Sequence, residues 1–203
     1  MTPRTTEDRW QETHNQILSS AEQLFATKGF NGTSMNDIVK DSGFSKGALY
    51  NHFESKERLF LSLWEHQTNV GIEQLKQLFS PEDKAVDKII KVAKVTMAST
   101  CDCPREMGRI QIEFMITAAR MKSLEPDMKK RYETIHKFIH EIFEEGVSNG
   151  EFKPGIDYNA ITSILFATLD GLQLHFATLN IKFDTKQLQD TLIKMIFEGI
   201  LAK

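Results

Sequence analysis

The sequence predicts an all-α fold, and three observations carry that prediction. Apolar residues recur at intervals of three and four in one segment after another, which is the period of a helix with a buried face. No segment shows the alternation of apolar and polar residues that a half-buried strand requires. Glycine and proline separate the periodic segments and divide the 203 residues into about nine helices.

The spacing of apolar residues and the positions of capping residues predict the helices up to about residue 147. Ile17, Ala21 and Phe25 share one face of a helix over residues 9–28, and Gly29 ends it. Residues 34–60 divide into three helical pieces, which begin after Ser34, Ser45 and Ser55. The third piece continues to about residue 79. Further helices are expected over residues 82–100 and 126–147, and between them a helix that follows the break at residues 101–104 and ends at about residue 121.

The last two helices are expected over residues 157–179 and from 184 or 185 to the end. The boundary between an N-terminal domain (residues 1–60) and a C-terminal domain (residues 61–203) falls inside the long helix that begins after Ser55. No flexible linker separates them, which suits a protein that transmits a change from one part to the other.

Composition excludes several classes of protein. A hydrophobic fraction of 40% and a charged fraction of 26% are those of a soluble globular protein, and the net charge of −3 argues against a polycation that coats nucleic acid. The N-terminus lacks the apolar core of a signal peptide, so we expect a cytoplasmic protein. Residues 161–181 are apolar but contain Asp170, Gln173 and His175, which favours a helix between protein partners over a membrane span.

Residues 34–53 predict a helix-turn-helix. Ser34 and Asp37 form a capping-box pattern, and Gly43 can take the positive φ that ends a helix. The second helix would bury Leu49 and Phe53. Its other side carries small or hydrogen-bonding residues and no Asp or Glu, as a helix that enters the major groove of DNA requires. These residues are Ser45, Lys46, Gly47, Tyr50, Asn51 and His52.

This stretch resembles the DNA-binding signature of the TetR family of bacterial transcriptional regulators. The resemblance covers roughly residues 10–64, and its most specific part is LYNHFESKERLF at residues 49–60. The matching positions are residues 32–34, 37–38, 43–53, 55–57 and 59–60. The rest of the chain is similar to the family in length and helical character. The resemblance implies an N-terminal three-helix DNA-binding domain and a C-terminal helical domain for ligand binding and dimerisation.

The resemblance places direct base contacts at Lys46, Gly47 and Asn51. Lys46 can reach guanine O6 and N7, and Gly47 lets the backbone come close to the DNA. Phosphate contacts are expected from Tyr50, His52, Lys56 and Ser34. Two further residues, Asn36 and Ser45, are expected at the edge of the site. The alternatives are a solvated helix face and, for His52, a structural histidine.

The penultimate helix is apolar on more than one face, which indicates a partner surface. Ala167 and Gly171 would allow close approach of a second helix. The resemblance implies that the last two helices of each subunit form the interface of a homodimer, which sets the two recognition helices about 34 Å apart or slightly more. The expected interface residues are Ala167, Asp170, Gly171, Leu174 and Ile196. Asp170 has a ligand contact as its alternative role.

Large, flexible side chains in the middle helices could line a cavity for a small hydrophobic ligand. The candidates are Met97, Phe114, Met115, Phe138 and Phe166. On residue types alone, a plain core is the favoured explanation. The resemblance favours the cavity, because TetR-like regulators typically bind a small inducer there.

Other pairs give weaker signals. Cys101 and Cys103 are a thiol or metal sensor or a chance pair, and no nearby ligand supports a metal site. His136 and His140 share a helix face without an evident third ligand, so we expect no metal there. Arg109 and Glu113 form a helix surface pair or a polar anchor for a ligand. No cofactor site and no enzyme signature is recognised.

The sequence therefore predicts a regulator that binds a palindromic double-stranded DNA operator as a homodimer and is released by a small hydrophobic ligand. Repression is the default that the resemblance implies, and activation stays open. Two other hypotheses are a DNA-binding protein without an inducer, and a helical enzyme or ligand carrier that keeps a relic DNA-binding head.

Overall fold

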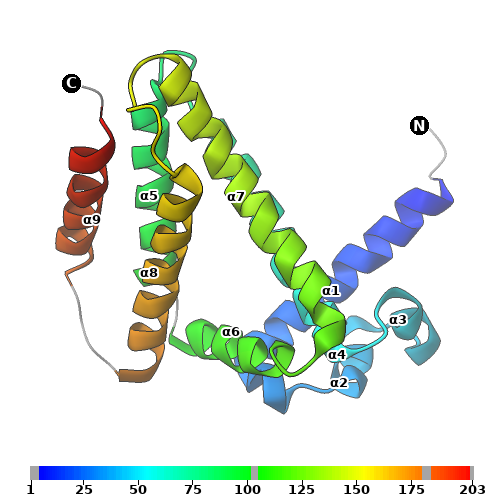
Figure 1. Ribbon diagram of the computed structural model, residues 1–203. Helices are drawn as coiled ribbons and strands as arrows, with labels where there is room; N and C mark the ends of the chain where they lie inside the picture. Colours follow the sequence, from blue (N-terminus) through cyan, green and yellow to red (C-terminus); the bar gives the residue numbers. More distant parts are fainter. Residues whose placement is uncertain (1–4, 102–104, 180–183, 202–203) are drawn as a thin grey trace. The chain divides into compact units, whose positions relative to one another are not determined.

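The computed structural model describes residues 5–101, 105–179 and 184–201. Within these ranges the chain forms nine α-helices and one short 3-10 helix, η1, so the predicted all-α class is confirmed (Figure 1). The helices are α1 Thr6–Gly32, α2 Met35–Ser42, α3 Lys46–His52, α4 Lys56–Gln77, α5 Ala85–Cys101, α6 Arg105–Ala118, α7 Glu125–Ser148, α8 Tyr158–Leu179 and α9 Thr185–Ile200, with η1 at Lys122–Leu124.

Packing divides the chain into two compact units. The first combines Met1–Gln67 with Arg109–Met128, and the second combines Thr68–Gly108 with Lys129–Lys203. The first unit thus takes in most of α6 and the start of α7 besides the N-terminal helices. Helices α4, α6 and α7 each contribute residues to both units. The functional boundary near residue 60 stays a prediction.

Local capping explains where the first helices begin and end. Helix α1 begins at Thr6, earlier than the pattern of apolar residues suggests, because Thr5 and Asp8 form a capping box. Gly29, with φ +76°, interrupts α1 before its last turn. Ser34 and Asp37 form the predicted capping box of α2, and Gly43 ends that helix with φ +73°.

An aromatic cluster forms much of the core of the first unit. The rings of Phe60 and Phe114 stack with their centroids 4.4 Å apart. Phe30 meets both rings edge-on, at 5.3 Å and 5.5 Å, and Phe25 lies 5.1 Å from Phe60. Such edge and offset contacts between buried rings stabilise a core beyond the area that they remove from water. Helix α6 is therefore part of this unit through Phe114.

The core of the second unit is centred on Phe143 and Phe152. Both side chains are fully buried, and the Phe143 ring stacks on Tyr158 at 4.6 Å. Phe152 packs so closely against α7 that a Cβ at Gly146 would lie 2.2 Å from its ring. The backbone of Phe152 also pairs with Leu201 in an isolated β-bridge, which joins the residue after α9 to the segment after α7.

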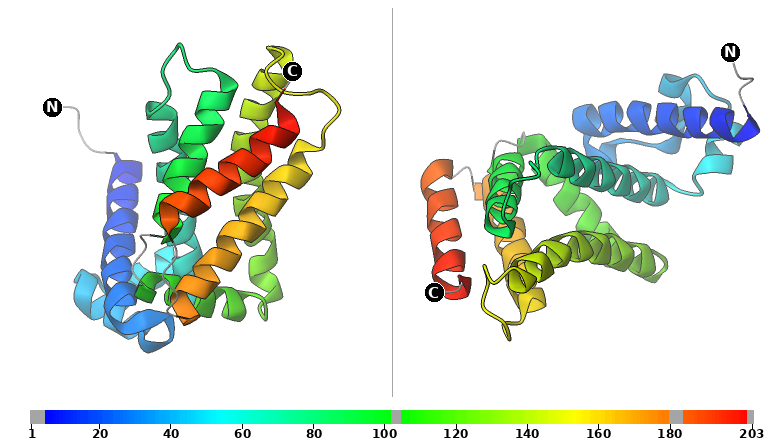
Figure 2. Two further views of the ribbon diagram at one scale, coloured as in Figure 1. Left: turned by 90° about the vertical axis from the view of Figure 1, so that its left-hand side faces the viewer. Right: turned by 90° about the horizontal axis from the view of Figure 1, so that it is seen from above.

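Helices α5, α8 and α9 lie side by side in the second unit (Figure 2). Among the described residues α8 is the one helix that is long and apolar enough, by length and composition, to cross a membrane. A helix that packs against protein can have the same composition. Only 11% of the residues in its most apolar window are buried within this chain, and large apolar side chains of α8 such as Ile164 and Leu174 are exposed.

Candidate nucleic-acid interface

Helix α3 presents the surface that the sequence predicts for DNA recognition. Leu49 is fully buried and faces the inside of the first unit. Ser45 caps the helix, because its side chain accepts a hydrogen bond from the Ala48 amide. The exposed side carries no carboxylate in its first turn. The predicted contact residues that are exposed here and on α2 are Ser34, Asn36, Ser45, Lys46, Gly47, Tyr50 and Asn51.

Two side chains of α3 lie on the same stretch of this face. The Lys46 ammonium lies 5.8 Å from the centroid of the Tyr50 ring, a distance at which a cation is attracted to the ring face. The pair places a positive charge and a phenol hydroxyl on one exposed surface one helical turn apart. Such a surface can donate hydrogen bonds to base edges and to phosphates.

Ser34 is engaged within its own capping box. Its amide and hydroxyl both donate to the Asp37 carboxylate, and the Asp37 amide donates back to the hydroxyl. These bonds, with a further one from Lys28 Nζ at 3.0 Å, hold the pKa of Asp37 far below its usual value. Asp37 is thus ionised at the start of α2. A phosphate at this helix end would depend on the first-turn backbone amides rather than on the Ser34 hydroxyl.

Lys56 is also occupied inside the first unit. Its ammonium donates a hydrogen bond of 2.7 Å to the Phe30 carbonyl, and burial lowers the pKa of the amine. The side chain therefore joins the start of α4 to the last turn of α1. Its predicted phosphate contact stays a prediction. The structure assigns Lys56 a second role that the sequence pattern does not reveal.

His52 lies at the end of α3 against two rings of α1. The Trp10 ring centroid is 4.7 Å from that of His52 and 5.0 Å from that of His14. Sequence reasoning missed Trp10 and His14. The available signal is their spacing of four residues, which places both on one face of α1.

The ligand candidates do not gather around one cavity. Phe114 belongs to the aromatic core of the first unit, and Met115 is exposed. Phe138 is buried beside Phe79, and Phe166 lies 5.6 Å from His136. Met97 alone among these candidates lines the apolar groove along α8 and α9 described next.

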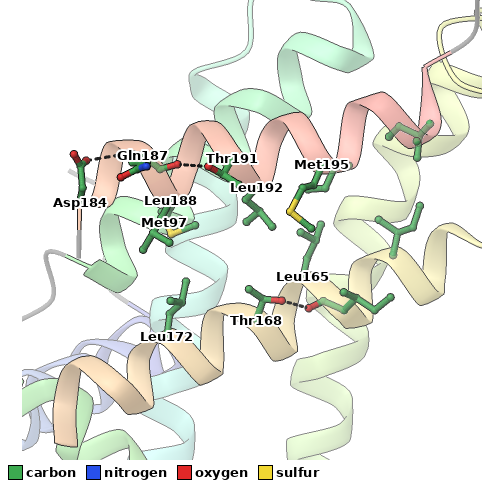
Figure 3. A pocket seen from close by; sticks show the side chains of 15 residues that line it. Met97, Leu165, Thr168, Leu172, Asp184, Gln187, Leu188, Thr191, Leu192 and Met195 are labelled. Carbon is green, nitrogen blue, oxygen red and sulfur yellow. Dashed lines mark hydrogen bonds between the residues drawn. The ribbon is translucent and has the colours of Figure 1, made fainter. Parts of the chain in front are cut away.

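This groove has a volume of about 630 Å³. Leu165 and Leu172 of α8 face Leu188, Leu192 and Met195 of α9 across it (Figure 3). Most of its lining is aliphatic, and its polar groups include Asp184, Gln187 and Thr191 at one end. The groove can hold a flexible aliphatic group or the side chains of a second protein surface.

The dimerisation candidates lie mainly on one open strip of α8. Ala167, Asp170 and Leu174 are exposed, and a Cβ at Gly171 would meet nothing within 4 Å. Ile196 is half-buried on α9, where it lines the apolar groove. A second helix could approach α8 closely along this strip.

The remaining candidate pairs show other contacts than the predicted ones. Glu113 accepts a hydrogen bond of 3.3 Å from the Asn31 amide at the end of α1. His140 lies 3.2 Å from Glu144, and no cluster of three metal-ligating side chains occurs among the described residues. Cys103 lies outside the described residues, as does the side chain of Cys101.

Two family models match the chain. Residues 17–63 match the family described as bacterial regulatory proteins, tetR family, and residues 89–189 match the tetracyclin repressor-like C-terminal domain. The regulator QacR of Staphylococcus aureus is 30% identical over 158 residues, which cover 78% of this chain and 82% of QacR. The regulator YfiR of Bacillus subtilis is 28% identical over 85% of this chain and 83% of its own.

Solved structures show the same fold. A TetR transcriptional regulator from Chloroflexus aurantiacus superposes with a TM-score of 0.72 at 22% identity, over 96% of this chain and 99% of its own. The regulator FadR of Bacillus subtilis, solved in complex with stearoyl-CoA, superposes with a TM-score of 0.70 at 19% identity, over 91% and 98%. At these identities the similarity speaks for the fold alone.

Proposed function

Because the chain belongs to the tetR family of bacterial regulatory proteins, a family of DNA-binding transcriptional regulators, we propose that it is a cytoplasmic repressor that a small hydrophobic ligand releases from a palindromic operator. The exposed face of α3 supports this proposal most directly. That face is free of carboxylates in its first turn, and it rests on the buried Leu49. No enzymatic activity is part of the proposal.

Base recognition in this proposal belongs to the exposed face of α3. Lys46 donates to guanine O6 and N7, Gly47 allows close approach of the backbone, and Asn51 forms hydrogen bonds with a base edge. Phosphate contacts come from Tyr50, His52, Lys56 and the helix end at Ser34, and Asn36 and Ser45 lie at the edge of the site. Phosphate contacts make the affinity fall steeply as the salt concentration rises.

The open strip of α8 supports a homodimer. Helix α8 carries exposed apolar side chains, among them Ile164 and Leu174, which form a surface that water disfavours. We place a second copy against α8 and α9, with Ala167, Gly171 and Leu174 at the centre of contact. A twofold axis between the copies pairs two recognition helices with two half-sites about 34 Å apart or slightly more.

The aliphatic lining of the α8–α9 groove favours a hydrophobic ligand over a strongly charged one. One solved neighbour, FadR of Bacillus subtilis, holds stearoyl-CoA, whose acyl chain is aliphatic although its CoA part is charged. Release from DNA would follow from a shift in the populations of two conformations of the dimer. Ligand stabilises a dimer whose recognition helices no longer match two successive grooves, and linkage requires DNA to weaken ligand binding by the same factor.

Selection of bound sequences from random duplex DNA tests the proposal. An enriched inverted repeat is the expected result. The selected duplex then serves to compare Lys46→Ala with the matched control Lys186→Ala, an exposed lysine on α9. We expect Lys46→Ala to weaken binding by about tenfold or more and to relax the preference at one base position, whereas the control binds like the wild type. Absence of enrichment at low salt would overturn the proposal.

A further inference from the structure

Four aromatic side chains form a continuous cluster where α1 meets the end of α3. The centroids of His14 and His52 are 5.7 Å apart, and Trp10 stacks on His14 with an angle of 20° between the planes. On the other side, His14 lies 4.7 Å from Phe53, the residue that ends α3. The last turn of the recognition helix therefore rests on two rings of α1.

The hydrogen-bond partners of the two imidazoles suit their neutral forms. His14 Nε2 lies 3.4 Å from the hydroxyl of Ser62 on α4. The Nδ1 atoms of His14 and His52 are buried, and neither has a hydrogen-bond partner among the described residues. An imidazolium carries two N–H donors, so protonation of either ring would leave a charged donor buried without an acceptor.

Neither burial nor the neighbouring imidazoles favour such a proton. Burial lowers the pKa of His14, and the neighbouring rings of His52 and His66 lower it further. Burial likewise lowers the pKa of His52. The charged groups that line the adjacent hollow come from the loop before α4, from α4 and from α7. They are Glu54, Arg58, Glu65 and Asp127, of which Arg58 and Asp127 pair with each other.

We propose that Trp10 and His14 are positioning residues for DNA recognition, and that they hold the His52 end of α3 on α1 only while both imidazoles are neutral. The inference rests on the proposed role of α3. Acidification places two like charges within one ring stack, so it loosens the end of the recognition helix. DNA binding by this chain then weakens in acid through His14, although protonation of a surface histidine would ordinarily strengthen attraction to phosphate.

The variant His14→Phe distinguishes the packing of the ring from the effect of its protonation. The variant keeps an aromatic ring between Trp10 and Phe53 but cannot be charged. With the duplex selected from the random pool, we expect the variant to bind like the wild type at about pH 7.5. Between about pH 7.5 and 5.5, the dissociation constant of the wild type should rise roughly tenfold relative to that of the variant. His140→Phe, in the second unit, is the matched control and should keep the wild-type profile.

Parallel pH profiles of the wild type and His14→Phe would overturn the inference. A second measurement is independent of DNA and of the variant: titration of the imidazole protons by NMR should give pKa values for His14 and His52 below the ordinary value. Values at or above the ordinary one would also overturn it. If random duplexes show no enrichment at all, the proposed function fails, whereas enrichment with parallel profiles removes only the role of His14.

Trp10→Leu tests the positioning role at neutral pH. Loss of the indole removes the ring that contacts both histidines, so we expect weaker binding of the selected duplex and a smaller difference in affinity between matched and mismatched duplexes. The far-ultraviolet circular dichroism of the helices should stay unchanged. If Trp10→Leu binds the selected duplex with unchanged affinity and still distinguishes matched from mismatched duplexes as the wild type does, the positioning role of Trp10 is overturned.

Discussion

The ammonium of Lys56 lies 4.3 Å from the centroid of the Phe30 ring and donates a hydrogen bond to the carbonyl of the same residue. One cation thus satisfies a carbonyl at the end of α1 and covers the face of a ring in the aromatic core. Phe30 in turn contacts Phe60 and Phe114. The start of α4 is therefore joined to the core through Lys56, close to the helix-turn-helix.

Lys56→Met removes this contact and keeps much of the aliphatic stem. We expect the free energy of unfolding to fall by about 1 kcal/mol, because the Phe30 carbonyl loses a charge-assisted donor. Urea unfolding of the variant measures this change. Lys40→Met, at an exposed position on α2, is the control and should leave the midpoint unchanged.

The same variant distinguishes the two roles of Lys56. If the ammonium also contacts phosphate, the slope of log affinity against log salt concentration should decrease by about 1 in Lys56→Met. An unchanged slope with a lower stability would restrict Lys56 to its structural role. An unchanged stability would contradict the role that the Phe30 contact indicates.

Gly146→Ala should be among the most damaging single-methyl substitutions in the second unit. The added Cβ would lie 2.2 Å from the Phe152 ring and 2.9 Å from the Ala85 side chain, and both neighbours are buried in the core. Overpacking of this kind destabilises proteins by about 1–3 kcal/mol. Thermal unfolding checks the expectation. Gly71→Ala is the control, since its Cβ meets nothing within 4 Å in α4, and it should raise stability by up to about 1 kcal/mol.

Glu151 caps a helix from which it is distant in sequence. Its two carboxylate oxygens accept hydrogen bonds from the Ala85 and Val86 amides, at 3.2 Å and 3.1 Å, at the start of α5. Because a negative charge there also interacts favourably with the helix dipole, Glu151→Ala should lower the free energy of unfolding by roughly 1–2 kcal/mol. The exposed Glu141 on α7 offers a control, as Glu141→Ala should change the unfolding midpoint little. Equal effects of the two substitutions would contradict the capping role.

These cases show which features the sequence can predict. The capping box of Ser34 and Asp37 and the positive φ of Gly43 are local, because every partner lies within a few residues, and both were predicted correctly. The face of α3 follows from the same short stretch. In contrast, the Glu151 cap and the contact of Lys56 with Phe30 join residues far apart in sequence, and no periodicity indicates them.

The ligand candidates illustrate the same limit. Phe114 and Met97 are both large, apolar and helical, so residue type does not separate a core ring from a groove-lining side chain. Only the packing of α6 against α1 and α4 assigns Phe114 to the aromatic core, whereas Met97 lines the groove along α8 and α9. Placement of this kind depends on tertiary contacts.

Asp37 should make the stability of the first unit depend on pH in the acid range. Its pKa is held far below the usual value by the hydrogen bonds from Ser34 and Lys28, whereas in the unfolded chain it returns to about 3.9. A carboxyl with a depressed folded-state pKa contributes stability above the unfolded-state pKa, and this contribution is lost as the pH falls toward the folded-state value. We therefore expect the urea midpoint of the wild type to decrease below about pH 4 more steeply than that of Asp37→Asn. Asp190→Asn, at an exposed position on α9, is the control and should follow the wild type. If Asp37→Asn and the wild type lose stability in parallel, the network around Ser34 does not hold the carboxylate as its geometry indicates.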